Sequence, residues 1–136
     1  MNILFFLTPK QDVAYIQDDL TIRQTLEKME HHSYTAIPMI DKDSRYVGTI
    51  TEGDLLWSIK ERGLDLKKTE NLPISSVKRR MDNRAISVNT RIEELISTSL
   101  NQNFVPVVDD RGVFIGIITR KRILQYCFEQ MKNIAE

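Results

Sequence analysis

Thr51 and Asp54 are the residues of this chain whose types and spacing best suit the binding of a ligand. They stand in the segment Gly48-Thr49-Ile50-Thr51-Glu52-Gly53-Asp54, where a strand is expected to end and a helix to begin. The start of a helix carries unpaired amides and a positive dipole end, which attract phosphate. A threonine there can hydrogen-bond phosphate or ribose, and an ionised aspartate accepts two hydroxyls. The pair predicts a site for a phosphorylated sugar, although Thr51-x-x-Asp54 would also serve as a helix-capping box without a ligand.

A second helix start, 68 positions later, carries three cations. The segment Gly116-Ile117-Ile118-Thr119-Arg120-Lys121-Arg122 keeps the glycine and the threonine but has Arg122 where the first segment has Asp54. Arginine cannot accept a hydrogen bond from ribose, but arginine and lysine both bind phosphate. Three cations in the first turn oppose the helix dipole unless an anion lies between them. We therefore expect Arg120, Lys121 and Arg122 to contact phosphate, with a solvated basic turn as the alternative, and we expect two unequal sites.

The two segments belong to an internal repeat. Residues 34–56 align with residues 102–124 without a gap, so that Pro38 matches Pro106 and Gly48 matches Gly116, each pair 68 positions apart. Two copies are too few for a solenoid, so they are expected to close on each other about a pseudo-twofold axis. Such an axis predicts two related clefts.

Each copy predicts the order β-α-β-β-α, which makes the fold class α/β. The two helices that follow the lead-in strands are expected to begin with capping boxes at Thr21 and Thr90. The next strand of each copy contains a proline, which has no N–H to donate, so we expect that strand at a sheet edge or with an irregular start. The predicted strands are 13–16, 35–40, 46–50, 85–88, 104–108 and 113–118, and the terminal helices are 52–62 and 120–134.

The chain between the copies is a polar connector. It covers residues 64–76 and includes Pro73. The predicted organisation is one repeat at 1–63, the connector at 64–76 and a second repeat at 77–136. The first terminal helix is expected to bury Leu55, Leu56 and Ile59 and to stop near Gly63.

The composition and motifs of the sequence argue against several classes of function. The 19 basic and 19 acidic residues cancel, which argues against a nucleic-acid-binding protein. The single cysteine, Cys127, fits a reducing compartment, and the short apolar run Ile3–Leu7 fits neither a signal peptide nor a membrane span, so a cytoplasmic protein is expected. The sequence contains no nucleophile–base set, and His31-His32 has no further metal ligand at suitable spacing. We expect neither an enzyme nor a metal site, and we expect Lys78-Arg79-Arg80 to be a solvated basic face.

The duplication resembles the CBS domain. The resemblance rests on TAIPMID and YVGTITEGDLL in the first copy, FVPVVDDRGVFIGIITRKRIL in the second, and the lead-ins Phe6-Leu7-Thr8-Pro9 and Val77-Lys78-Arg79-Arg80-Met81. It covers nearly the whole chain. More narrowly, the spacing is similar to that of small stand-alone CBS proteins of Gram-positive bacteria that bind cyclic di-AMP.

The resemblance implies adenine-nucleotide sensing. In CBS pairs, backbone groups at the positions of Thr35–Ile37 or Asn103–Val105 read the base, and the aspartate at the position of Asp54 holds ribose. Tyr34 and Phe104 could stack on a base or belong to the core. The nucleotide-binding residues implied in this way are Ala14, Tyr34, Thr35, Ala36, Ile37, Thr51, Asp54, Phe104, Val105, Thr119, Arg120, Lys121 and Arg122.

Two functions remain open at this stage. One is a regulatory adaptor in which an adenine nucleotide or cyclic dinucleotide (cyclic di-AMP, AMP or ATP) alters binding to another protein. The alternative is a constitutive subunit of an enzyme or transporter with a vestigial nucleotide site. Neither requires a cofactor or a membrane. The terminal helices are expected to pair two copies into a homodimer, since C2 dimers are the commonest symmetric assembly.

Overall fold

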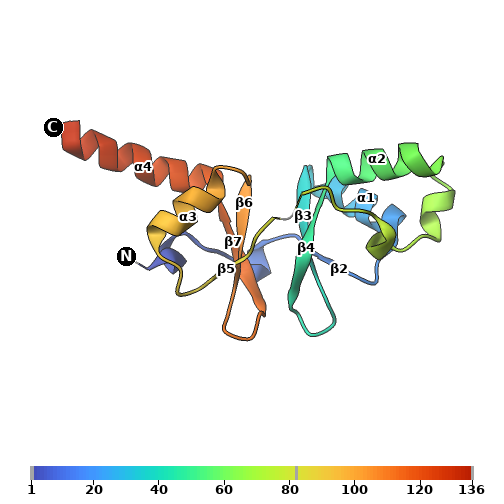
Figure 1. Ribbon diagram of the computed structural model, residues 1–136, viewed down its shortest axis with the longest axis horizontal. Helices are drawn as coiled ribbons and strands as arrows, with labels where there is room; N and C mark the ends of the chain where they lie inside the picture. The colour runs from blue at the N-terminus through green and yellow to red at the C-terminus, as the bar shows by residue number, and fades with distance from the viewer. Residues whose placement is uncertain (1, 82, 136) are drawn as a thin grey trace. The chain divides into compact units, whose positions relative to one another are not determined.

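The computed structural model describes residues 2–81 and 83–135 and has a mixed α/β fold (Figure 1). In these residues it contains four α-helices and two sheets. Two compact units are present, Ala14–Asp82 and a second unit made of Met1–Val13 together with Asn83–Glu136. The N-terminal segment thus joins the unit of the second copy, and the run from Val77 to Met81 joins that of the first. The exact limits of the repeats in the sequence stay a prediction.

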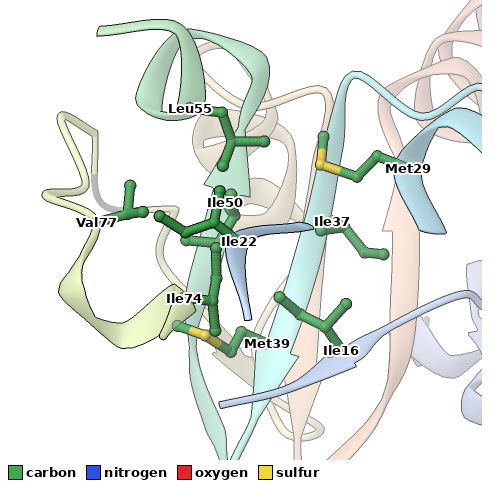
Figure 2. Packing of buried hydrophobic residues seen from close by; sticks show 9 residues of the cluster. All are labelled: Ile16, Ile22, Met29, Ile37, Met39, Ile50, Leu55, Ile74 and Val77. Atoms are coloured by element: carbon green, nitrogen blue, oxygen red, sulfur yellow. The ribbon is translucent and has the colours of Figure 1, made fainter. Parts of the chain in front are cut away.

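The unit Ala14–Asp82 is a three-stranded sheet with two helices. The sheet order is β2-β3-β4, in which β2 is parallel and β4 antiparallel to β3. The elements are β2 (Ile16–Gln17), α1 (Ile22–His32), β3 (Ala36–Ile40), β4 (Tyr46–Thr51), α2 (Glu52–Arg62) and the 3-10 helices η3 (Lys68–Glu70) and η4 (Ile74–Ser76). Its core, shown in Figure 2, consists of Ile16, Ile22, Met29, Ile37, Met39, Ile50, Leu55, Ile74 and Val77.

The other unit repeats this plan and adds a strand from the N-terminus. Its sheet order is β1-β7-β6-β5. The elements are η1 (Ile3–Phe6), β1 (Thr8–Pro9), η2 (Lys10–Asp12), β5 (Ile86–Ser87), α3 (Ile92–Ser99), β6 (Phe104–Val108), β7 (Phe114–Thr119) and α4 (Arg120–Ala135). The core contains Ile3, Phe6, Ile86, Leu95, Val105, Val107, Ile118 and Ile123. The predicted β-α-β-β-α order is confirmed in both units.

The helix ends follow the sequence signals in the first copy but not fully in the second. Thr21 and Gln24 form the expected capping box, and Gly63 ends α2 in the left-handed conformation with φ 61°. The box expected at Thr90 is wrong. The N-cap of α3 is Arg91, one residue later, and no side chain caps it. Thr90 donates its backbone N–H to the Ser87 carbonyl instead, at 3.0 Å.

The two proline-containing strands are not edge strands, and the irregularities in their pairing lie at their ends, after Met39 and after Val107, so the expectation of an edge position or an irregular start is wrong. Both β3 and β6 lie between two neighbours in their sheets. The prolines are tolerated because one neighbour is very short. Pairing with β2 begins at Met39, one residue after Pro38, and pairing with β5 begins at Val107, one residue after Pro106. At the position of each proline, the strand therefore has a paired neighbour on one side only, β4 for Pro38 and β7 for Pro106. No second strand is present there that would need an N–H from the proline.

The first terminal helix buries less apolar surface than expected, and the second leaves an apolar stripe exposed. On α2, Leu55 is buried but Leu56 is 59% exposed, because Leu56 is one position further around the helix. On α4, Ile123 is buried, whereas an apolar stripe stays exposed: Leu124, Phe128, Met131 and Ile134. None of the helices in the described residues is long and apolar enough to cross a membrane.

Candidate functional site

Thr51 and Asp54 lie together at the start of α2 and bond each other. The hydroxyl of Thr51 accepts the Asp54 N–H at 3.1 Å, and Oδ2 of Asp54 accepts the Thr51 N–H at 3.0 Å. This is the capping box that the spacing also allowed. The pair therefore fixes the point where β4 turns into α2, whatever else it binds.

The second oxygen of Asp54 is occupied as well. Oδ1 accepts the backbone N–H of Arg80 at 2.8 Å. Asp54 is only 1% exposed, and a backbone N–H donates to each of its carboxylate oxygens. These hydrogen bonds compensate for the loss of water around the buried carboxylate. A hydroxyl can reach this carboxylate only after a group that covers it has moved.

The strand end at Thr35–Ile37, which the resemblance predicts to read a base, adjoins this helix start. Ala36 pairs with Thr51 across β3 and β4, and the Glu52 N–H donates to the Thr35 carbonyl at 2.9 Å. Ile37 is fully buried in the core, so it can offer a ligand only its backbone. The structure thus brings Thr35, Ala36 and Thr51 to one place.

Tyr34 links the same region to Ala14. Its hydroxyl accepts the Ala14 N–H at 3.5 Å, the limit of a hydrogen bond, and its ring packs against the core cluster. The side chain also borders a groove between α1 and α2. These contacts give Tyr34 a structural role and keep Ala14 beside it.

The second copy reproduces this junction between strand and helix. Phe104 pairs with Thr119, and the Arg120 N–H donates to the Asn103 carbonyl at 2.8 Å. The hydroxyl of Thr119 accepts the Arg122 N–H at 3.2 Å. Phe104 and Val105 are both buried, so their aromatic and aliphatic side chains belong to the core.

The three cations of the second helix start do not all converge. Nε of Arg120 donates to the Ser99 carbonyl at 2.8 Å, which satisfies the C-terminal end of α3. The guanidinium of Arg122 lies over Phe5, 5.1 Å from the ring centroid. Arg120 and Lys121 both line an open hollow of about 590 Å³, together with Asn103, Leu124, Gln125 and Phe128. Because the Arg120 guanidinium is engaged with the end of α3, Lys121 is the cation of this turn best situated to meet an anion from solution.

Sequence reasoning missed the role of Lys78-Arg79-Arg80. Arg79 donates to the Val47 carbonyl at 3.2 Å, and Arg80 forms an ion pair with Glu61 at 2.6 Å. The sequence did carry one signal, Gly48 inside a strand, because a Cβ at that position would overlap the Arg79 guanidinium. The run packs on the first unit and adjoins Asp54.

Trp57 belongs to the same cluster. It is 39% exposed, and cations lie over its ring, Arg80 at 5.4 Å and Lys60 at 5.2 Å from the centroid. Elsewhere, His31 and His32 stack edge to face at the exposed end of α1. Within residues 2–81 and 83–135, no group of three or more His, Cys, Asp or Glu could hold a metal ion.

The family model of the CBS domain matches residues 6–61 and 69–129, which is most of the chain. The chain belongs to the CBS domain family. Among curated relatives, this CBS pair is 28% identical to the cyclic di-AMP receptor B of Bacillus subtilis over 131 residues, covering 95% of this chain and 88% of that protein. It is 25% identical over 111 residues to an uncharacterised 17.7 kDa protein of Acidianus ambivalens, covering 79% of this chain but only 62% of that relative.

A solved structure shares the fold of the whole CBS pair. The CbpB protein of Listeria monocytogenes, in complex with c-di-AMP, superimposes with a TM-score of 0.84. The match covers 96% of this chain and 97% of that one, at 22% sequence identity. At this identity the match establishes the fold of the CBS pair.

Proposed function

We propose that this CBS pair is a cytoplasmic regulatory adaptor that senses an adenine nucleotide and changes its binding to another protein accordingly. The candidate ligands are cyclic di-AMP, AMP and ATP. The observation that carries the proposal is the junction between strand and helix that recurs in both units, with Glu52 N–H to Thr35 carbonyl at 2.9 Å and Arg120 N–H to Asn103 carbonyl at 2.8 Å. Each junction sets strand-end backbone beside a helix start, so a base and a phosphate can be bound side by side.

The roles in the first site follow from this geometry. Backbone groups of Ala14 and Thr35–Ile37 read the edge of the base, because the side chain of Ile37 is buried. The Thr51 hydroxyl and the amides of the first turn of α2 face phosphate. The carboxylate of Asp54 accepts ribose hydroxyls.

The second site differs because it has no carboxylate at the equivalent position. Asn103–Val105 offer backbone to the base, and Thr119 and Lys121 face phosphate. Arg120 and Arg122 contribute positive potential while they hold α3 and Phe5. This site is suited to a multiply charged ligand.

Ribose chemistry separates the candidate ligands. Adenosine, AMP and ATP carry a 2′,3′-diol, which can bridge both oxygens of Asp54. In cyclic di-AMP each 3′ oxygen is esterified, so each ribose offers only its 2′ hydroxyl. A contact to Asp54 would therefore favour mononucleotides, and contacts to the second helix start would favour cyclic di-AMP. The relationship to the Bacillus subtilis receptor supports cyclic di-AMP as a ligand.

A constitutive subunit with a vestigial nucleotide site is the second candidate function. The observation in its favour is the state of Asp54, which is 1% exposed and has a backbone donor on each oxygen. In that case the carboxylate is only a structural link.

A thermal-shift panel distinguishes the two functions. A ligand that binds only the folded protein at a hundredfold excess over Kd stabilises it by about 2.7 kcal/mol, which raises Tm by several degrees. We expect shifts with AMP, ATP or cyclic di-AMP and none with GMP or GTP, since the backbone reads the edge of adenine. Equal shifts with guanine nucleotides, or none with any nucleotide, would contradict the sensor.

The CBS pair is also proposed to be a homodimer. The exposed stripe of α4, which is Leu124, Phe128, Met131 and Ile134, spans three turns of one helix face. On α2, Leu56 and part of Trp57 are exposed as well. Apolar surface of this kind is commonly covered by a second copy.

A further inference from the structure

The segment Lys78–Arg80, called the strap below, is fastened across the start of α2. At one end, Val77 is buried in the core cluster that also contains Ile50 and Leu55 (Figure 2). At the other end, Arg80 reaches α2 through both its backbone and its side chain. All of these contacts lie within the unit Ala14–Asp82.

Arg80 makes the contacts that matter most for Asp54. Its backbone N–H donates to Oδ1 of Asp54 at 2.8 Å. Its guanidinium pairs with Glu61 at 2.6 Å and lies over the ring of Trp57 at 5.4 Å. These side-chain contacts of Arg80 thus help to hold its backbone N–H against the Asp54 carboxylate. Both side chains of the ion pair are about half exposed, 46% and 61%, so this hold is weak enough to be reversed.

Asp54 is covered while the strap is in place. The residue is 1% exposed, and each of its carboxylate oxygens already accepts a backbone N–H. Lys78 and Arg80 line the small cavity beside this residue. A ribose diol can therefore reach the carboxylate only after Arg80 has moved.

We propose that the backbone N–H of Arg80 and a ribose diol compete for Asp54, so that nucleotide binding releases Arg80 from the start of α2. This inference rests on the proposed function. Arg80 is then a positioning residue, which closes the ribose subsite in the empty protein. Arg80 stands near the end of the unit Ala14–Asp82, so its release alters the segment through which the chain leaves this unit. Nucleotide occupancy is converted in this way into a change that a partner protein can detect.

Hydrogen exchange of the Arg80 amide tests the competition directly. The bond to a buried carboxylate protects this amide in the free protein. Saturation with adenosine, which has the diol but no charge, should make its exchange faster, whereas bound ligand ordinarily slows exchange. The control ligand 2′,3′-dideoxyadenosine lacks the diol and should leave the amide protected. The emission of Trp57, the single tryptophan, should change with adenosine and not with the control ligand.

Variants of the strap supply the second readout. Arg80→Ala keeps the backbone N–H but removes the ion pair and the cation–π contact, so adenosine should bind about three- to thirtyfold more tightly. Glu61→Gln should give a gain of up to about fivefold. The matched control is Glu70→Gln, which breaks another partly exposed ion pair, with Arg23, in the same unit and should leave affinity unchanged.

The outcomes separate this inference from the function on which it rests. If adenosine binds while the Arg80 amide exchanges no faster and Arg80→Ala binds no more tightly, the strap proposal is overturned and the nucleotide site stands. If neither the natural protein nor Arg80→Ala binds adenosine, AMP or cyclic di-AMP, the proposed function fails, and the strap has no competitor.

Discussion

The backbone N–H of Arg80 donates to Oδ1 of Asp54 across 26 residues of sequence, at 2.8 Å. The repeat equivalent of Asp54 is Arg122, and it makes a corresponding contact in the other unit, over Phe5. Asp54 and Arg122 are each the third residue of their helix, α2 and α4. Each therefore contacts a segment that the repeat pattern assigns to the other copy, Arg80 in one case and Phe5 in the other. The chemistry differs, because a carboxylate accepts an amide in one case and a guanidinium lies over aromatic rings in the other.

Loss of the Asp54 carboxylate should destabilise the protein before any ligand is considered. Asp54→Ala leaves the N–H groups of Thr51 and Arg80 without their acceptors, and we expect a loss of about 2–4 kcal/mol in the free energy of unfolding. Urea unfolding measures it. Arg122→Ala, at the equivalent position, removes an aromatic contact and should lose only about 1 kcal/mol. Equal losses for the two variants would show that the buried carboxylate has no special structural role.

Local signals in the sequence predicted the parts of the fold that depend on neighbouring residues. The repeat of apolar and turn residues gave the β-α-β-β-α order, and the box at Thr21 and the end at Gly63 follow from side chains within one turn of the helix. The capping box predicted at Thr90 is wrong because α3 begins one residue later, with Arg91 as its N-cap. The pattern also assigned Leu56 to the buried face, from which it is one helix position away.

The parts of the candidate site that the sequence could not predict depend on distant partners. Whether Asp54 is open to a ligand depends on Arg80, and whether Arg120 faces phosphate depends on the carbonyl of Ser99 at the end of α3. The spacing of apolar and polar residues along the sequence does not indicate contacts between residues so far apart. Gly48 was the nearest signal, since it leaves room for Arg79, but it does not say which side chain fills that room.

Two cations at the start of α4 should have different roles: Arg120 should stabilise the fold, and Lys121 should bind ligand. Arg120→Ala removes a charged donor from the carbonyls of Ser99 and Leu100, so the free energy of unfolding should fall by about 1–2 kcal/mol. Lys121→Ala should leave stability within about 0.5 kcal/mol, because that side chain is exposed. Lys121→Ala should instead weaken cyclic di-AMP by a few fold at low salt and spare adenosine, with the effect shrinking at high salt. Calorimetry at two salt concentrations checks this division, and a salt-independent loss would argue against a phosphate contact.

The proposed homodimer depends on the exposed face of α4. Phe128→Glu introduces a charge into the middle of the stripe and should shift the protein from a dimer to a monomer of 15.8 kDa, as measured by light scattering. Its Tm at low concentration should stay close to that of the unaltered protein, because Phe128 contributes little to the core of its own unit. Glu129→Gln, on the next residue of the same helix, is the matched control and should remain a dimer. A monomeric natural protein at micromolar concentration would refute the assembly.

Asp109 should make the stability of its hairpin depend on pH. The N–H groups of Arg111, at 2.8 Å, and Val113, at 3.0 Å, both donate to its Oδ1 between β6 and β7, and these bonds lower the pKa of the carboxyl below its usual value. A carboxyl with a lowered folded-state pKa contributes stability above its unfolded pKa, and that stability is lost as the pH falls through the folded pKa. Asp109→Asn should therefore be less stable than the natural protein at pH 7, and the difference should disappear toward pH 2. Urea unfolding between pH 2 and pH 7 measures this, with Asp110→Asn, the exposed neighbour, as the control. A difference that stays constant over that range would mean that the charge of Asp109 is unimportant and that only its size and shape hold the turn.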